Sequence, residues 1–311
     1  ESAGILDAST LGKIDIQGTD ASEFLNRVYT NAWSKLAIGK CRYGLMLNED
    51  GMVYDDGVTT RLDENHYVMT TTTGGAANVL SKLEDYLQTE WPELDVYLTS
   101  VTDHFATISV CGPNSKKIIS TVIDDLDFSD ENFPHMTFKN AKIGKINCRV
   151  MRISFTGELS YEINVQANYA KSVWEKCMEA GKDFNITPYG TETMHLLRAE
   201  KGFIIVGQDT DGTMTPVDLQ MDWIVSKKKY DFIGKRSLYR SDTIREDRKQ
   251  LVGLLTDNPE DVLEEGSQIV ADVKKSPVEM LGHVTSSYFS PNLKKSIALA
   301  VVRGGKNMMG K

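Results

Sequence analysis

Residues 45–71 of this 311-residue chain read LMLNEDGMVYDDGVTTRLDENHYVMTT. Short apolar and β-branched runs alternate here with turn sequences at residues 48–51, which include Asp-Gly, and at residues 63–65. Asp-Gly between two β-type runs is a strong signal for a tight hairpin turn. We therefore expect consecutive antiparallel strands in this stretch.

The sequence that follows adds helices to these strands. Apolar residues recur every three or four positions over residues 76–88, which predicts an amphipathic helix. Alternating runs near residues 94–98 and 104–110 predict further strands, and a second helical pattern covers residues 115–123. The order β-β-β-α-β-β-α predicts an α+β fold with mostly antiparallel pairing, not a doubly wound nucleotide-binding fold.

The composition changes after residue 240. Residues 242–249 are mostly charged and resemble a linker, and short strand-like runs follow at residues 251–255, 281–286 and 297–302. This pattern predicts a small all-β domain that starts near residue 245. Neither GxGxxG nor GxxxxGK[ST] occurs, so the sequence lacks the usual signals for binding the phosphates of NAD or ATP.

The composition also excludes several classes of function. Lys and Arg number 35 against 44 Asp and Glu, and the resulting net charge of −9 argues against nucleic-acid binding. No apolar run approaches the roughly 20 residues that span a bilayer. The four cysteines lie far apart without a CxxC pair, which is typical of the reduced thiols of a cytoplasmic protein. Because no HExxH motif or His/Cys quartet occurs, we expect no protein-bound metal.

Two places in the sequence carry candidate site residues, and the first is the pair Asp55 and Asp56 in a predicted strand. Neighbouring side chains of a strand point to opposite faces, so only one of the two carboxylates can serve a given pocket. The alternative interpretation is an acidic pair beside a turn that serves no site.

The second candidate is Glu162, which follows a glycine turn between two predicted strands. It shares a strand face with Ser160 and Asn164, opposite Tyr161 and Ile163. A carboxylate in this position can accept two parallel N–H bonds from a planar heterocycle. The alternative is an exposed glutamate on the solvent face of a sheet.

Several longer stretches together resemble one family, the aminomethyltransferase (glycine-cleavage T-protein) superfamily of tetrahydrofolate-binding proteins. They are GILDASTL at 4–11, CRY at 41–43, DGMVYDD at 50–56, TGELSYE at 156–162, RAEKGFIIVGQD at 198–209, FIGK at 232–235 and TSSYFSPNLKKSIAL at 285–299. Residues 70–75, 85–99, 186–194 and 221–235 show a narrower resemblance, to the C-terminal folate-binding part of the alpha subunit of heterotetrameric sarcosine oxidase.

The resemblance implies a three-lobed, cloverleaf-like fold with folate in a central channel. Residues 1–244 would form the folate-binding aminomethyltransferase-like domain, with a ferredoxin-like lobe inserted at residues 45–150. Residues 245–311 would form a C-terminal β-barrel that is one or two strands short of the family's barrel. Because the chain also begins at Glu1 without an initiator methionine, we expect it to be part of a larger subunit.

Residue by residue, the resemblance implies roles for six side chains. Asp56 matches the catalytic acidic group beside N5 and N10 of the folate. Glu162 matches the carboxylate that holds the pterin N3–H and 2-amino group, and Tyr43 matches a folate-contacting aromatic residue.

The other three positions depart from the family pattern. Leu11 falls where the T-protein has a pocket methionine, and Thr71 falls where it has a polar asparagine. Phe155 occupies a position that is Tyr in related dimethylglycine enzymes, so a phenol contact is lost. The T-protein's arginine in its late helix has no clear match near Thr193 and Met194.

The resemblance implies an enzyme that transfers one-carbon units to tetrahydrofolate. It would form 5,10-methylenetetrahydrofolate from the imine or formaldehyde that sarcosine oxidation produces. Flavin and NAD are expected only in other segments or subunits, and the expected partners are hetero-oligomeric sarcosine oxidase subunits. The alternatives are a stand-alone aminomethyltransferase, a folate-dependent demethylase, or a non-catalytic folate-binding or assembly module.

Overall fold

The computed structural model describes residues 2–310 and contains three β-sheets. Residue contacts divide the chain into two compact units. The first unit consists of Glu1–Asn26, Ala32–Gly44 and Asp55–Met194, and the second of Arg27–Asn31, Leu45–Tyr54 and His195–Lys311. No helix in the described part of the chain is long and apolar enough to cross a membrane.

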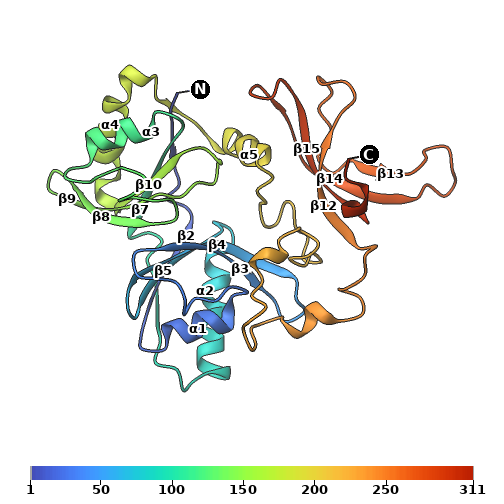
Figure 1. Cartoon of the computed structure of the whole chain (residues 1–311), viewed down its shortest axis with the longest axis horizontal. Coiled ribbons are helices and arrows are strands. Elements are labelled where there is room, and N and C mark those ends of the chain that lie inside the picture. Colours follow the sequence, from blue (N-terminus) through green and yellow to red (C-terminus); the bar gives the residue numbers. More distant parts are fainter. Residues whose placement is uncertain (1, 311) are drawn as a thin grey trace. The chain divides into compact units, whose positions relative to one another are not determined.

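The first sheet has five strands in the order β3-β4-β5-β2-β6. Its strands are β2 (Gly12–Gln17), β3 (Cys41–Leu47), β4 (Val53–Asp63), β5 (His66–Thr71) and β6 (Tyr97–Ser100). Helices α1 (Ala21–Val28) and α2 (Ala76–Asp85) lie along one side of this sheet (Figure 1). The helix predicted at 76–88 is confirmed as α2, which continues as a π-helical turn over Tyr86–Glu90.

The second sheet has six strands in the order β11-β1-β7-β10-β9-β8. Its strands are β1 (Gly4–Asp7), β7 (Phe105–Cys111), β8 (Phe138–Ile143), β9 (Ile146–Met151), β10 (Ser160–Gln166) and β11 (Thr187–Pro188). Helices α3 (Ser115–Val122) and α4 (Ala170–Ala180) pack on one face of it (Figure 1). The core between them contains Ile118, Val173, Tyr161 and Ile163.

The strand pairings differ from the single lobe expected over residues 45–150. Strands β3 to β6 belong to the first sheet, whereas β7, β8 and β9 belong to the second. Strand β7 pairs with β1, about 100 residues earlier in the chain, and with β10, about 50 residues later. These long-range pairings divide the segment between two sheets. The pairing is mostly antiparallel, as predicted; β1 and β11 form a parallel pair.

The third sheet contains the predicted C-terminal strands, in the order β12-β15-β14-β13. They are β12 (Lys249–Leu255), β13 (Gln268–Val270), β14 (Met280–Ser290) and β15 (Lys295–Arg303). Among the described residues these pairings form an open four-stranded sheet with β12 and β13 at its edges, without the closure that the predicted β-barrel requires. The domain boundary that we expect between residues 244 and 245 stays a prediction.

Helix α5 (Thr191–Glu200) and a largely irregular segment precede the third sheet. Short 3-10 helices lie at Ala167–Tyr169, Lys182–Phe184, Asp222–Ile224, Arg236–Tyr239 and Gly305–Met308. In the second unit, a buried ion pair between Arg198 of α5 and Asp209 is hydrogen-bonded to Ser286 of β14. This polar cluster joins the end of α5 to the third sheet.

Candidate functional site

The adjacent carboxylates of β4, Asp55 and Asp56, accept hydrogen bonds from different residues. Asp55 is 2% exposed, and its carboxylate accepts hydrogen bonds from the Thr72 amide at 3.2 Å and hydroxyl at 2.6 Å. Thr72 Oγ1 in turn accepts a bond from the Gly75 amide at 3.0 Å, at the start of α2. Asp56 instead accepts a 2.6 Å bond from the Tyr43 hydroxyl. The two carboxylates thus have different partners, as alternation along a strand leads us to expect.

Burial changes the protonation of both carboxyls. It raises the pKa of Asp56 to about 7, against the hydrogen bond from Tyr43, which lowers it; the charge of Asp55 raises it further. Burial likewise raises the pKa of Asp55 to about 6, partly offset by its bonds to Thr72. A carboxyl with a pKa near neutrality can both accept and return a proton at physiological pH. Asp56 therefore has the properties of a general base or acid.

Asp55 has a structural role, and this gives a first prediction. Asp55→Ala is expected to lower the free energy of unfolding by about 1–3 kcal/mol, because it leaves the half-buried amide and hydroxyl of Thr72 without their acceptor. Urea unfolding followed by circular dichroism measures this change. The exposed Glu84 of α2 offers a control, and Glu84→Ala should change stability by less than about 0.5 kcal/mol. Equal effects of the two changes would contradict this role.

Glu162 lies in the middle of the second sheet. Strand β10 pairs it with Ser109 of β7 and Met151 of β9. Its neighbours Tyr161 and Ile163 are fully buried in the core, so Glu162 occupies the opposite face of the sheet. The predicted face of Glu162 is confirmed. Burial raises the pKa of this half-buried carboxyl to about 7.

Lys13 of β2 is a site residue that the sequence did not reveal. Its side chain is 3% exposed, and Nζ donates hydrogen bonds to the carbonyl oxygens of Ser9 at 2.9 Å and Leu11 at 3.1 Å. Its positive charge opposes the rise in the pKa of Glu162. Lys13 precedes the buried Ile14 of a strand, a position at which alternation predicts an exposed side chain. No pattern in the sequence therefore indicated a buried lysine.

A close backbone approach brings Leu11 and Thr71 together. Gly12 is the direct partner of Thr71, and a Cβ atom at Gly12 would lie 2.0 Å from Thr71 Oγ1. Only glycine fits there, so the loop that carries Leu11 lies directly against β5. Thr71 is 1% exposed and donates its hydroxyl hydrogen bond to the Thr72 carbonyl at 2.9 Å.

Tyr189 is a second residue that sequence reasoning missed. Its hydroxyl accepts a hydrogen bond from Cys111 Sγ at 3.3 Å, and its ring lies against Gly4. Burial raises the pKa of Tyr189, and the negative charge of Glu162 adds to this rise, so the phenol lies near that carboxylate. Phe155, in contrast, is 36% exposed between β9 and β10.

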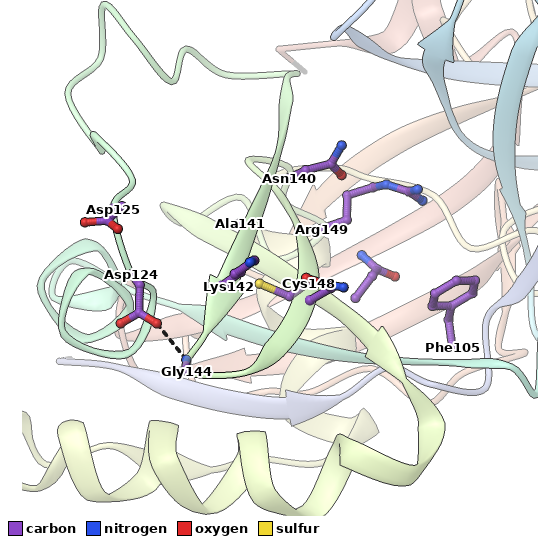
Figure 2. A pocket seen from close by; sticks show the side chains of 11 residues that line it. Phe105, Asp124, Asp125, Asn140, Ala141, Lys142, Gly144, Cys148 and Arg149 are labelled. Atoms are coloured by element: carbon purple, nitrogen blue, oxygen red, sulfur yellow. Dashed lines mark hydrogen bonds between the residues drawn. The ribbon is translucent and has the colours of Figure 1, made fainter.

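A hollow of about 800 Å³ lies elsewhere in the first unit, beside β8 and β9. Figure 2 shows its lining, where Asp124 accepts a hydrogen bond from the Gly144 amide. Its lining residues are Phe105, Asp124, Asp125, Asn140, Ala141, Lys142, Gly144, Asn147, Cys148, Arg149 and Asn164. None of the six predicted site residues lines it; Asn164 lies two positions beyond Glu162 on the same strand face.

Metal chemistry has no visible support in the described residues. Among residues 2–310, no group of three or more His, Cys, Asp or Glu side chains is arranged to hold a metal ion. The four cysteines are buried and unpaired in disulfides.

Comparison with known proteins assigns the chain to a family. The model of the GCVT N-terminal domain matches residues 1–229, and the model of the glycine cleavage T-protein C-terminal barrel domain matches residues 249–311. The chain belongs to the glycine cleavage T-protein family. This family also agrees with the α+β class of the first two sheets.

The similar proteins are of two kinds. The chain is 54% identical over 314 residues to the sarcosine oxidase subunit alpha of Corynebacterium sp. (strain P-1), and 47% identical over 313 residues to that of Rhizobium meliloti (strain 1021). It covers 32% of each of these subunits, about a third of their length. It is also 33% identical to the aminomethyltransferase of Caldanaerobacter subterraneus subsp. tengcongensis, with 96% of this chain and 77% of that protein covered.

A solved structure supports the fold of this family member. The glycine cleavage system aminomethyltransferase T from Bartonella henselae superposes with a TM-score of 0.84 and 24% sequence identity. The match covers 98% of this chain and 79% of that one. The α+β architecture predicted from the sequence is therefore the aminomethyltransferase fold.

Proposed function

We propose that the chain binds tetrahydrofolate and catalyses one-carbon transfer to it, forming 5,10-methylenetetrahydrofolate. One observation carries this proposal: the half-buried Glu162 carboxylate lies on the sheet face opposite the Tyr161 core and accepts no hydrogen bond from any described residue of the chain. A half-buried carboxylate without donors is costly unless something else supplies them. The pterin ring of folate offers two parallel N–H donors of the required geometry.

The residues around Glu162 fit such a ligand. Lys13 favours the carboxylate form of Glu162, which accepts both N–H groups. Leu11 and Thr71 lie on either side of the close approach at Gly12, in the same compact unit as Glu162. We propose that they add one apolar and one polar side chain to the folate site. The predicted roles of Leu11, Thr71 and Phe155 stay part of this proposal.

Asp56 is proposed as the catalytic residue. Bound tetrahydrofolate supplies two amine nitrogens, N5 and N10, which the one-carbon unit bridges, with release of water from formaldehyde or of an amine from an imine. The Asp56 carboxylate accepts the proton that N10 loses, and its negative charge stabilises the positive charge that develops beside it. Tyr43 holds this carboxylate in place through its 2.6 Å hydrogen bond. No covalent nucleophile is required, because orientation and exclusion of water lower the barrier.

We further propose that the one-carbon donor comes from the oxidation of sarcosine. The support is the 54% identity to a subunit named sarcosine oxidase alpha, of which this chain covers 32%. Flavin and NAD would then bind in other segments or subunits, and the partners would be the other sarcosine oxidase subunits. The four buried thiols fit a reducing, cytoplasmic setting. A stand-alone aminomethyltransferase, as the 33% identical relative is named, is the second candidate.

The proposed function predicts different effects on binding and turnover at Asp56. Asp56→Asn should lower the rate of 5,10-methylenetetrahydrofolate formation by about 10²-fold or more, because the amide cannot accept the N10 proton. Affinity for tetrahydrofolate should change by less than about 3-fold, since the pterin contacts Glu162 instead. Anaerobic stopped-flow measurement of product formation, with the spontaneous reaction of formaldehyde and tetrahydrofolate subtracted, provides the rate.

A matched control distinguishes catalysis from a passive binding role. Asp63→Asn changes an exposed carboxylate at the end of the same strand and should leave both quantities unchanged. If Asp56→Asn forms product as fast as the wild type, Asp56 is not the catalytic residue; if the wild type binds folate but does not exceed the spontaneous rate, the chain is a non-catalytic folate-binding module. If the wild-type chain does not bind tetrahydrofolate, the proposed function is wrong.

A further inference from the structure

Lys13 is a buried cation whose position is fixed by the backbone. Its ammonium donates hydrogen bonds to the carbonyl oxygens of Ser9 and Leu11, in the loop that precedes β2. An ammonium group leaves water at a high cost, which hydrogen bonds and nearby negative charge must offset.

The loop around Lys13 is attached to β7, next to Glu162. The Thr107 amide donates a 3.1 Å hydrogen bond to Ser9 Oγ, so the loop lies against Thr107. Thr107 and Ser109 share one face of β7, and Ser109 is the direct cross-strand partner of Glu162. The two carbonyls that hold Lys13 thus belong to a loop that lies against β7, the strand directly paired with the one that carries Glu162.

Several acidic and titratable groups lie near Lys13 and Glu162. The acidic groups near Lys13 are Glu162, Asp7 and Asp103, and the titratable groups near Glu162 include Lys13, Tyr189 and Cys41. Burial raises the pKa of Cys41 to about 12 and also raises the pKa of Tyr189, so both groups are neutral near pH 7. Lys13 is therefore the cation that favours the charged form of Glu162.

We propose that Lys13 is a positioning residue for the folate site: its hydrogen-bonded ammonium favours the carboxylate form of Glu162, which accepts the two pterin N–H groups. This inference rests on the proposed function. A protonated carboxyl would present an O–H donor toward a ring edge that itself carries donors, so its affinity for the pterin would be lower. Lys13 acts on the ligand only through Glu162.

The test uses the whole 311-residue chain and a stable reduced folate, 5-formyltetrahydrofolate. Its affinity is measured by titration calorimetry between about pH 6 and pH 9 for the wild type, Lys13→Met and Lys13→Arg. Lys145→Met, at an exposed position between β8 and β9, is the control. Wild-type affinity should rise with pH around a midpoint near 7, because burial raises the pKa of Glu162 to about 7.

In Lys13→Met this midpoint should move upward by about 1 pH unit, so that affinity falls about 5-fold at pH 7 and recovers near pH 9. Lys13→Arg, which keeps the charge, and Lys145→Met should keep the wild-type midpoint. Recovery at high pH is the decisive result, because a structural defect would lower affinity at every pH. If Lys13→Met does not fold, Lys13→Gln serves in its place, since its amide can still donate to one of the two carbonyls.

Two results would overturn the inference. An unchanged midpoint in Lys13→Met would show that the ammonium does not control Glu162, while folate binding itself stands. An equal loss of affinity at all pH values would show that Lys13 only supports the loop. Absence of folate binding in the wild type is a different result, which contradicts the proposed function.

Discussion

Arg198→Met is expected to lower the free energy of unfolding by about 3–5 kcal/mol, the largest stability effect that we predict for this chain. Arg198 is fully buried, pairs with Asp209, and donates hydrogen bonds to the Ser286 hydroxyl at 2.5 Å and the Phe203 carbonyl at 3.0 Å. Methionine fills a similar volume, so the change removes the charge and leaves the Asp209 carboxylate buried without a cation. Urea unfolding monitored by tryptophan fluorescence measures the loss.

The double variant and an exposed pair show whether the buried charge is the cause. Asp209 also accepts bonds from the Thr285 hydroxyl at 2.6 Å, so Asp209→Asn alone should destabilise as well. Because the two residues share one network, Arg198→Met with Asp209→Asn should cost less than the sum of the single changes. Arg245→Met breaks an exposed, solvent-screened ion pair with Asp247 and should leave the free energy of unfolding nearly unchanged. An equally small change in the free energy of unfolding for Arg198→Met would contradict a stabilising role of the buried Arg198–Asp209 pair.

Local patterns in the sequence predicted the local features of the fold well. The spacing of apolar residues over 76–88 predicted helix α2, and strand alternation correctly separated Asp55 from Asp56 and placed Glu162 opposite Tyr161. These features depend on side-chain period within one element, which neighbouring residues determine. These local predictions agree with the structure even in segments whose strands pair differently from the expectation.

The larger arrangement depends on contacts between distant residues. Nothing in the sequence of β7 indicates that it pairs with β1 and β10 rather than with its neighbours β5 and β6. The open third sheet is likewise a matter of which strand edges meet, which alternation within each strand does not specify. The strand pairings therefore divide residues 45–150 between two sheets, and the third sheet is open in its pairings, although its residues match the family model of a barrel domain.

In the candidate site, too, the sequence indicates contacts between neighbouring strands but not contacts between distant residues. The contact between Asp56 and Tyr43 joins two residues 13 positions apart on neighbouring strands, within reach of the family resemblance. Lys13 and Tyr189 approach Glu162 from positions far away in the chain, and each lies in a context that predicts an ordinary surface or loop residue. Only the three-dimensional structure shows that Lys13 acts on the charge of Glu162 and that Glu162 acts on the phenol of Tyr189.

Glu162→Gln is expected to weaken the binding of reduced folate by about 10²-fold and, at the same time, to stabilise the empty protein. The amide of glutamine keeps one acceptor but turns an N–H donor toward the donors of the pterin, which removes at least one charge-assisted bond worth about 1.5–3 kcal/mol. Titration calorimetry near pH 8 measures the affinity. The pH dependence of binding should also flatten, because the group that titrates near pH 7 is gone.

The gain in stability follows from the direction of the pKa shift. Burial raises the pKa of Glu162 from 4.5 to about 7, so the folded chain holds this proton more tightly than the unfolded chain does. The contribution of Glu162 to stability therefore falls as pH rises from about 4.5 to 7 and stays low above pH 7. Glu162→Gln removes this loss, and at pH 8 its Tm should exceed that of the wild type by about 2–4 °C, with no gain at pH 4. Glu84→Gln, an exposed change in α2, should alter neither affinity nor Tm. Unchanged folate affinity in Glu162→Gln would show that the pterin does not bind at this carboxylate, whatever the change in Tm.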